Sequence, residues 1–267
     1  MPGEILYQLK NVSYNYPGGE EALSGISMSV NQGEKVVLLG ANGCGKSTLL
    51  KVLDGLLFPQ QGTIYSFGEI INEENLGREE FSFAFRRRVG FVFQNSEAQL
   101  FNPSVWEEIA FGPLQMGLDG PEIRRRVEGV MAMLGLENLK DRPPFKLSGG
   151  EKKKVAIASV LSINPEVILF DEPTSGLDPR TQNWLINLIR QLSGAGKTLI
   201  TSTHNLNIVE EIADRVLVFS EDHRLVASGS PAEILSDREL LLQVNLVDEQ
   251  FHRHMHNGSH RHYHAHG

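Results

Sequence analysis

The segment Gly40-Ala41-Asn42-Gly43-Cys44-Gly45-Lys46-Ser47 fits the pattern G-x-x-x-x-G-K-[ST] of phosphate-binding loops. An apolar run at 35–39 precedes it and a helical run at 48–57 follows it. This order of strand, loop and helix is the context in which the pattern is specific; the plain alternative is a glycine-rich turn without a ligand. The segment therefore predicts a phosphate-binding loop at the start of a helix.

The chemistry of this loop suits a polyphosphate. Its glycines let successive backbone N–H groups and the helix N-terminus point at phosphate oxygens. Lys46 supplies positive charge for the β and γ oxygens, and the Ser47 hydroxyl is a ligand type that Mg²⁺ accepts. The candidate nucleotide-binding residues of the loop are Gly40, Ala41, Asn42, Gly43, Cys44, Gly45, Lys46, Ser47 and Thr48.

Two carboxylates follow the apolar run at 167–170. At the end of a buried strand beside the phosphate loop, Asp171 can hold Mg²⁺ through water, and Glu172 can orient or deprotonate an attacking water. Taken alone, an Asp-Glu pair after a strand could equally be the start of a loop. Together with the phosphate loop, it predicts hydrolysis of a nucleotide.

Apolar runs rich in Val, Ile and Leu recur before turns at 35–40, 166–171, 197–203 and 215–219. Helical patterns separate several of them, which predicts an α/β fold with strands buried on both faces. Short strands in the first thirty residues and around 62–65 predict an antiparallel β subdomain beside that core.

Between about residues 103 and 165 the pattern is helical, which predicts an inserted α-helical subdomain. Ser104 and Glu107 have the spacing of a capping box. A second helix closed by Gly135 is expected to bury one face, made of Ile123, Val127, Val130 and Leu134.

Composition excludes several classes of protein. The 267 residues are 40% hydrophobic and 22% charged, which is typical of a globular chain and unlike a disordered or fibrous one. A net charge of −8 argues against nucleic acid as the main partner. The single cysteine suits a reducing compartment, the N-terminus lacks a signal peptide, and the apolar runs fall short of the roughly 20 residues that span a bilayer. We expect a cytoplasmic chain that reaches a membrane only through a partner.

A second motif, Leu147-Ser148-Gly149-Gly150-Glu151, precedes three lysines and an apolar helix. Its plain interpretation is a capping box formed by Ser148 and Glu151. A serine hydroxyl and glycine amides at a helix N-terminus also make a second anion site, in a chain that already has a phosphate loop. With both motifs present, the sequence resembles the ATP-binding-cassette ATPases over about residues 5–235.

This resemblance implies a P-loop NTPase core of the RecA-like type that uses ATP and Mg²⁺. It also implies a head-to-tail dimer, formed with a second copy or a paralogue, in which Ser148, Gly149 and Gly150 contact the ATP on the partner. Asp178 matches the family's aspartate at the dimer seam. Tyr16 matches the aromatic residue that stacks on adenine, with Tyr14 as the competing choice.

The same resemblance assigns the residues of hydrolysis. Gln94 matches the glutamine that reaches Mg²⁺ and the lytic water, and His204 matches the histidine that contacts the γ-phosphate. The implied catalytic residues are Glu172, His204 and Gln94, and the implied Mg²⁺ ligands are Ser47, Gln94 and Asp171.

The amino-acid sequences of 93–101 and of 147–158 resemble those of the ATPase subunits of energy-coupling-factor importers, especially the cobalt and nickel branch. In that branch the segment after the glutamine borders a groove for a transmembrane subunit; Phe101 and Phe111 could line it, and Trp106 is assigned to the core. The resemblance implies an ATP-hydrolysing subunit at the cytoplasmic face of the membrane, bound to integral-membrane subunits, that drives cobalt or nickel uptake. An importer for another substrate such as a vitamin, a soluble cassette ATPase and a metal-storage protein stay open as alternatives.

The C-terminal tail is rich in histidine, mostly in H-x-H spacing. Imidazole is a good ligand for Ni²⁺ and Co²⁺, so the tail is a candidate metal-binding segment, although a solvated tail without ligand or an expression tag would have a similar composition. The candidate ligands are His252, His254, His256, His260, His262, His264 and His266. We divide the chain into a nucleotide-binding domain at 1–235, a short helical extension at 236–251 and a disordered tail at 252–267.

Overall fold

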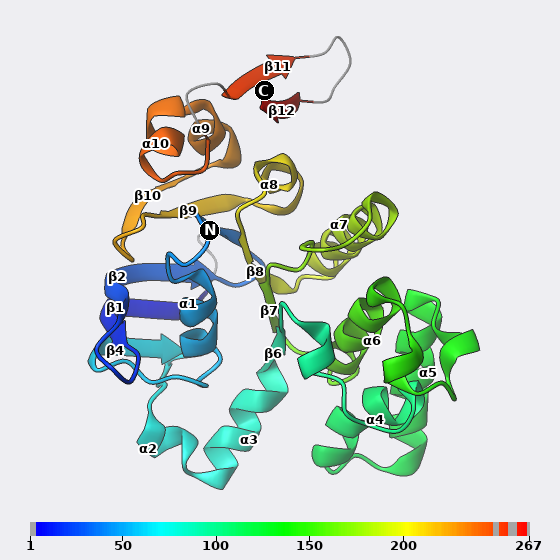
Figure 1. Cartoon of the computed structure of the whole chain (residues 1–267). Helices are drawn as coiled ribbons and strands as arrows, with labels where there is room; N and C mark the ends of the chain where they lie inside the picture. Colours follow the sequence, from blue (N-terminus) through cyan, green and yellow to red (C-terminus); the bar gives the residue numbers. More distant parts are fainter. Residues whose placement is uncertain (1–3, 248–250, 256–260, 266–267) are drawn as a thin grey trace. The chain divides into compact units, whose positions relative to one another are not determined.

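The computed structural model describes residues 4–247 and the backbone of two strands in 251–255 and 261–265 (Figure 1). The chain divides into two compact units, Met1–Glu73 with Ile186–Gly267, and Glu74–Leu185. The phosphate loop therefore belongs to the first unit, and both candidate carboxylates belong to the second.

An antiparallel sheet forms one part of the first unit. Its strands lie in the order β2 (Glu21–Asn31), β1 (Ile5–Asn15), β4 (Gln61–Ser66) and β5 (Glu69–Ile70). Buried and more exposed residues alternate over 26–31 of β2, as expected for a strand with one face on a core, whereas β1 buries Leu6 and Tyr7 in succession. The antiparallel β subdomain predicted from the sequence is confirmed.

The other strands of this unit lie in the order β10 (Leu225–Gly229), β9 (Arg215–Phe219), β3 (Lys35–Leu39) and β8 (Thr198–Thr203). Strand β3 runs parallel to β8 and β9, and β10 pairs antiparallel with β9. All of β8 is buried, and only the first residue of β3 and of β9 is not, which confirms the α/β core.

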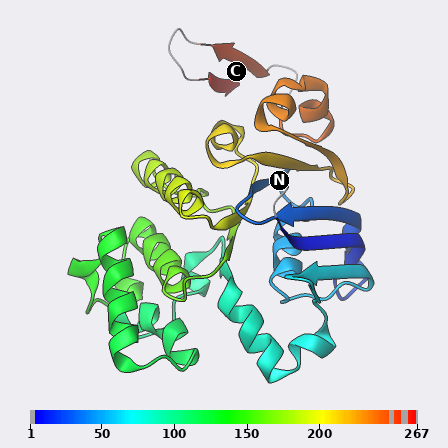
Figure 2. The same ribbon diagram turned by 180° about the vertical axis from the view of Figure 1, so that it is seen from behind.

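Within its described residues, the first unit contains the helices α1 (Lys46–Leu53), α8 (Leu206–Ile212), α9 (Pro231–Ser236) and α10 (Arg238–Gln243) (Figure 2). The helical extension expected at 236–251 begins earlier, because Ser230 and Glu233 form a capping box that starts α9 at Pro231.

The second unit contains a parallel pair of strands, β6 (Val89–Val92) and β7 (Val167–Asp171), both fully buried. The helix α2 (Glu73–Leu76) starts at the boundary between the units, and α3 (Glu79–Arg88) leads into β6. The inserted subdomain has three main helices, α4 (Val105–Gln115), α5 (Gly120–Leu134) and α6 (Gly149–Leu161). Short 3₁₀ turns lie at Ser96–Ala98, Glu137–Leu139 and Pro144–Lys146, and α7 (Pro179–Gly194) begins in this unit.

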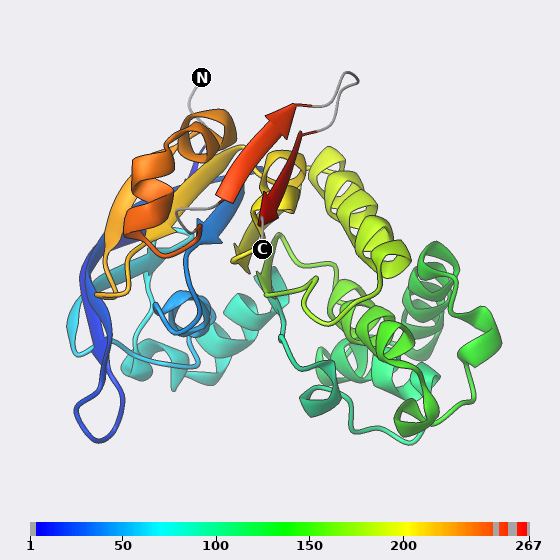
Figure 3. The ribbon, with the colours of Figure 1, turned by 45° about the horizontal axis from the view of Figure 1, so that its top comes forward.

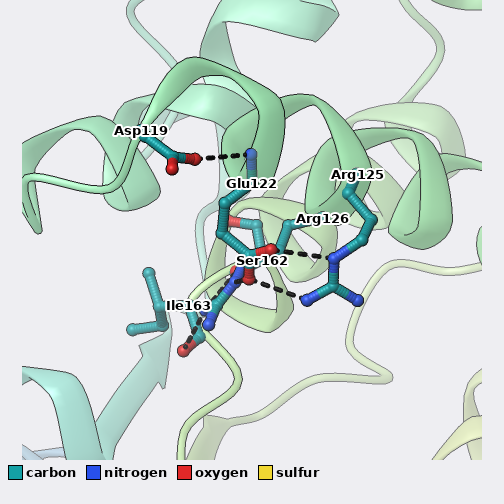
Figure 4. Close-up of polar contacts among 6 residues, drawn as sticks. All are labelled: Asp119, Glu122, Arg125, Arg126, Ser162 and Ile163. Carbon is teal, nitrogen blue, oxygen red and sulfur yellow. Dashed lines mark hydrogen bonds and ion pairs between the residues drawn. The ribbon is translucent and has the colours of Figure 1, made fainter.

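Polar contacts tie α5 to the end of α6 (Figure 4). Asp119 caps α5 by accepting a hydrogen bond from the Glu122 amide at 2.9 Å. Hydrogen bonds from Arg125 and Arg126 lower the pKa of Glu122 to about 2. The guanidinium of Arg126 also donates to the carbonyls of Ser162 at 3.3 Å and Ile163 at 3.2 Å.

The buried face of α5 differs from the expected one at one position. Ile123, Val127 and Leu134 are buried as predicted, but Met131 takes the place of Val130, which is only half-buried. Because residues four apart share a helix face, Met131 lies directly after Val127 on the buried stripe.

Where the sequence predicts a disordered tail, the structure pairs β11 (Phe251–Met255) with β12 (Arg261–Ala265) as an antiparallel ladder (Figure 3). His252 pairs with His264, and His254 pairs with His262. An H-x-H repeat has the period of two that a strand requires, which is the local reason for this pairing. His256, His260 and His266 lie outside the described residues.

Candidate active site

The phosphate loop connects β3 to α1 and depends on two glycines. Gly45 precedes α1 with a φ of +104°, and a Cβ there would lie 2.2 Å from the Ala22 carbonyl oxygen. A Cβ on Gly40 would lie 2.7 Å from the Cys44 sulfur. The two outer glycines of the motif are therefore required by close packing, and Cys44 lies buried between them.

Lys46 lies in the first turn of α1 and is 5% exposed. Its ammonium donates hydrogen bonds to the carbonyls of Gly40 at 2.7 Å and Ala41 at 2.9 Å, which hold the charge against the loop. Positive charge at a helix N-terminus, beside backbone amides, makes an environment that favours phosphate.

The aromatic residues before the first turn have different environments. The Tyr16 hydroxyl lies 3.1 Å from the Thr48 hydroxyl in α1, whereas Tyr14 is buried in the sheet at 7% exposure. Their rings meet edge to face with centroids 5.1 Å apart. Of the two candidates for stacking on adenine, the structure favours Tyr16, because it is the one that reaches the phosphate-loop helix.

His204 lies at the same edge of the parallel strands as the phosphate loop. Leu39, the last residue of β3, pairs with Thr203, the last residue of β8, so Gly40 and His204 leave the sheet side by side. His204 is exposed, and Asn205 after it caps α8. The carboxyl ends of parallel strands are where ligands bind in open α/β sheets.

The second unit gathers its own polar residues at the carboxyl ends of β6 and β7. Val92 pairs with Phe170, so the segment containing Gln94 and the carboxylates Asp171 and Glu172 leave the same edge. Asp171 is 4% exposed and Glu172 is 5% exposed. Glu172 has a φ of +40°, a strained conformation for a residue other than glycine and one that occurs most often at functional sites.

Ser148 begins α6 with both hydrogen bonds of a capping box. The Ser148 amide donates to the Glu151 carboxylate at 2.8 Å and its hydroxyl donates to the same oxygen at 2.7 Å. These two bonds, the amide one first, lower the pKa of Glu151. A Cβ on Gly150 would lie 3.1 Å from the Thr181 hydroxyl, so the start of α6 packs closely against α7.

Asp178 caps α7 beside this motif. Its carboxylate accepts hydrogen bonds from the Thr181 hydroxyl at 2.6 Å and from the amides of Arg180 at 3.0 Å and Thr181 at 3.1 Å. Thr181, first through its hydroxyl and then through its amide, keeps the pKa of Asp178 below its usual range. A cavity of about 710 Å³ opens beside the two helix starts; its lining includes Ser148, Gly149, Gly150, Asp178, Thr181 and Trp184.

Residues 23–175 match the family described as "ABC transporter", which is more than half of the chain. The chain belongs to the ABC transporter family. Its match to the family includes the phosphate loop, the glutamine segment, the second anion motif and both carboxylates, and the ATP-binding domain of this family is an ATPase.

Relatives of known name agree with this membership. The nickel import ATP-binding protein NikO of Rhodobacter capsulatus is 48% identical over 244 residues, 90% of this chain and 95% of that protein. The structure of CbiO1 from Clostridium perfringens, described as part of the ABC transporter complex CbiONQ, has a TM-score of 0.78 and 38% identity over 91% of this chain and 95% of that one. A dimer of the cassette MJ0796 with ADP and phosphate has a TM-score of 0.76 and 30% identity over 85% and 99%.

The sequence-predicted residues of this ABC ATPase thus form three groups in the described structure. The first unit holds the phosphate loop with Tyr16 and His204, and the strand edge of the second unit holds Gln94, Asp171 and Glu172. The third group, in the second unit, is Ser148, Gly149, Gly150 and Asp178 around the cavity. Among the described residues there is no cluster of three His, Cys, Asp or Glu that could hold a metal ion, and no helix long and apolar enough to cross a membrane.

Two residues that contact the candidate site, Lys153 and Thr181, were not predicted from the sequence. The sequence presents Lys153 only as one of three consecutive lysines after the second anion motif, but its side chain is buried at 3% exposure. Thr181 is an ordinary residue of a helix start whose contacts with Gly150 and Asp178 exist only in the folded chain. The apolar pattern of α6 predicts that position 153 is buried, and a lysine at such a position is unusual. This was the one sequence signal that could have indicated a role for Lys153.

Proposed function

We propose that this ABC ATPase is the ATP-hydrolysing subunit of a membrane importer for a transition-metal ion, Ni²⁺ or Co²⁺. The observation that carries the metal assignment is the relationship to NikO, which covers nearly the full length of both chains. The histidine-rich tail supports the same assignment, because imidazole is a good ligand for both ions. Three relatives of 46% to 51% identity have names that give no substrate. The choice of Ni²⁺ or Co²⁺ as the transported ion is therefore part of the proposal.

In this proposal the phosphate loop and Lys46 bind the β- and γ-phosphates of ATP, and Tyr16 stacks on the adenine. The Ser47 hydroxyl, the Gln94 amide oxygen and the Asp171 carboxylate are hard oxygen donors, a set that fits Mg²⁺. When bound, that ion neutralises charge on the phosphate oxygens.

Glu172 acts on the attacking water. The water oxygen bonds to the γ-phosphorus, the bond from phosphorus to the β,γ-bridging oxygen breaks, and the water proton passes to the Glu172 carboxylate. ADP and inorganic phosphate result. The buried strand before Glu172 fixes the position of its backbone, and His204 supplies a polar contact to the γ-phosphate at the edge of β8.

Ser148, Gly149, Gly150 and Asp178 complete the ATP site of a second cassette. Two helix starts beside one cavity suit the binding of an anion from outside the chain, and the related MJ0796 cassette is a dimer with ADP and phosphate bound. The dimer pairs two copies of this chain or this chain with a paralogue.

Exposed aromatic residues on α4 and before it suit a membrane-embedded partner subunit. Phe101 is 67% exposed and stacks edge to face on Phe111 with centroids 5.0 Å apart, and Leu114 is 58% exposed. This cluster follows the glutamine segment along the chain, so a partner bound there would contact the ATPase close to Gln94. In this role the chain lies peripherally on the cytoplasmic face of the membrane.

Metal uptake by the native host tests the transported substrate. Cells whose chromosomal copy carries Glu172→Gln should accumulate radiolabelled Ni²⁺ or Co²⁺ at a small fraction of the wild-type rate, because ATP turnover drives the transport. An immunoblot should show equal amounts of both proteins. Unchanged uptake of both metals together with impaired uptake of a vitamin would reassign the substrate, and no transport defect at all would favour a soluble ATPase.

The contact in trans is tested by Ser148→Arg on a Glu172→Gln background. The arginine places bulk and charge in the anion site, so we expect ATP to induce no dimer in gel filtration with light scattering. Ser230→Arg is the matched control, because Ser230 is also exposed and forms the same capping box on α9, and each change costs about 1 kcal/mol of helix capping. The control should dimerise normally; dimers formed equally by both variants would refute the role of Ser148.

A further inference from the structure

Lys153 lies in the second turn of α6, five residues after Ser148, and its ammonium is withdrawn from water at 3% exposure. It donates hydrogen bonds to two consecutive carbonyls, that of Phe93 at 3.2 Å and that of Gln94 at 2.9 Å. Strand β6 ends at Val92, so these carbonyls lie just beyond its last residue. The lysine therefore binds the backbone at the point where the glutamine segment leaves the sheet.

Two further contacts join the same segment to α6. The Gln99 side chain accepts from the Phe93 amide at 3.2 Å and donates to the Ala156 carbonyl at 3.0 Å. Lys152 forms an ion pair with Glu97, whose side chain is 68% exposed. This pair holds side chains only, whereas Lys153 and Gln99 bind the backbone of the segment itself.

A charge at this position is costly for the fold. Burial lowers the pKa of Lys153 to about 8, an effect that the nearby charge of Asp171 partly opposes, so the group stays mostly protonated at pH 7. An apolar side chain of the same length would be cheaper to bury. Packing alone does not explain a lysine here, whereas the two carbonyl contacts do.

We propose that Lys153 is a positioning residue that fixes the Gln94 peptide to the helix begun by Ser148, so that the glutamine side chain and the motif for the partner's ATP keep one geometry. This inference rests on the roles of Gln94 and Ser148 in the proposed function. A positioning error of about 1 Å can cost up to about a hundredfold in rate, so loss of these two hydrogen bonds should slow hydrolysis without removing nucleotide binding.

The test compares Lys153→Met, which keeps the length and removes the donors, with Lys153→Arg, which keeps donors. We expect kcat for ATP to fall about tenfold in Lys153→Met with KM changed less than about twofold, a lowered melting temperature because the carbonyls of Phe93 and Gln94 lose their donor, and recovery of most of kcat in Lys153→Arg. Lys152→Met is the matched control on the neighbouring, partly buried lysine, which pairs with the Glu97 side chain rather than with the Gln94 backbone, and should keep wild-type kcat. If Lys153→Met does not fold, Lys153→Leu, which also lacks a donor, should show the same loss.

Combination with Gln94→Ala shows whether Lys153 acts through the glutamine. Gln94→Ala should lower kcat strongly in the wild-type chain and little further in Lys153→Met, because the lysine variant has already displaced the same residue. Unchanged kcat in Lys153→Met, or losses that simply multiply, would overturn the inference. If Glu172→Gln still abolishes turnover in that case, the proposed ATPase mechanism stands and only the role of Lys153 is lost.

Discussion

A chain carrying Glu172→Gln is expected to bind ATP as the wild type does while its turnover falls by at least about a hundredfold, the usual contribution of a general base. The substitution removes the proton acceptor and one negative charge but keeps the size of the side chain. Glu172 is 5% exposed directly after a buried strand, and the phosphate loop lies in a different unit of the chain, so the phosphate-binding residues stay intact.

Phosphate release at saturating ATP measures the turnover, and equilibrium binding of a fluorescent ATP analogue measures affinity. Glu166→Gln is the matched control, because Glu166 just precedes β7 and its side chain forms a partly exposed ion pair with Arg88. It should hydrolyse ATP normally. Lys46→Ala should instead weaken ATP binding itself, and wild-type turnover in Glu172→Gln would show that Glu172 is not the base.

Removal of residues 252–267 is expected to abolish most binding of Ni²⁺ or Co²⁺ and to leave ATP turnover of the isolated subunit nearly intact. Seven of the nine histidines lie in this segment, outside every motif proposed to contact ATP. The described residues contain no cluster of three His, Cys, Asp or Glu that could hold a metal ion, so we expect the shortened chain to have no comparable site. Calorimetric titration with Ni²⁺ and with Co²⁺ compares the two chains.

The pairing of β11 with β12 allows a sharper variant. The register pairs position 252 with 264 and position 254 with 262. Changing these four histidines to Gln should remove most of the affinity, whereas Arg253→Gln with Tyr263→Gln, the directly paired positions between them, should not.

The affinity of the tail for metal is expected to decrease as the pH decreases. Only neutral imidazole coordinates a metal, so affinity should fall as the pH drops through about 6.5, where free histidine takes up a proton. Equal metal affinity with and without the tail would show that the histidines are not ligands, and the metal assignment would then rest on the relationship to NikO alone.

The residues of the phosphate loop and the capping residues of two helices could be predicted from the sequence alone. Gly40 and Gly45 are called for by the motif, and the structure shows why, since a Cβ at either position would collide with neighbouring atoms. The capping residues Ser104 and Ser148 follow from spacing alone. Such features are predictable because they depend on residues only a few positions apart.

Only the folded chain shows which of several neighbouring residues makes a given contact. Tyr16 rather than Tyr14 reaches Thr48, Met131 rather than Val130 faces the interior, and of three consecutive lysines it is Lys153 whose ammonium binds the carbonyls of Gln94 and Phe93. Each outcome depends on a partner from an element distant in sequence. Local periodicity cannot distinguish such neighbours, because the free energy that separates them comes from burial and from contacts that exist only once the elements have packed.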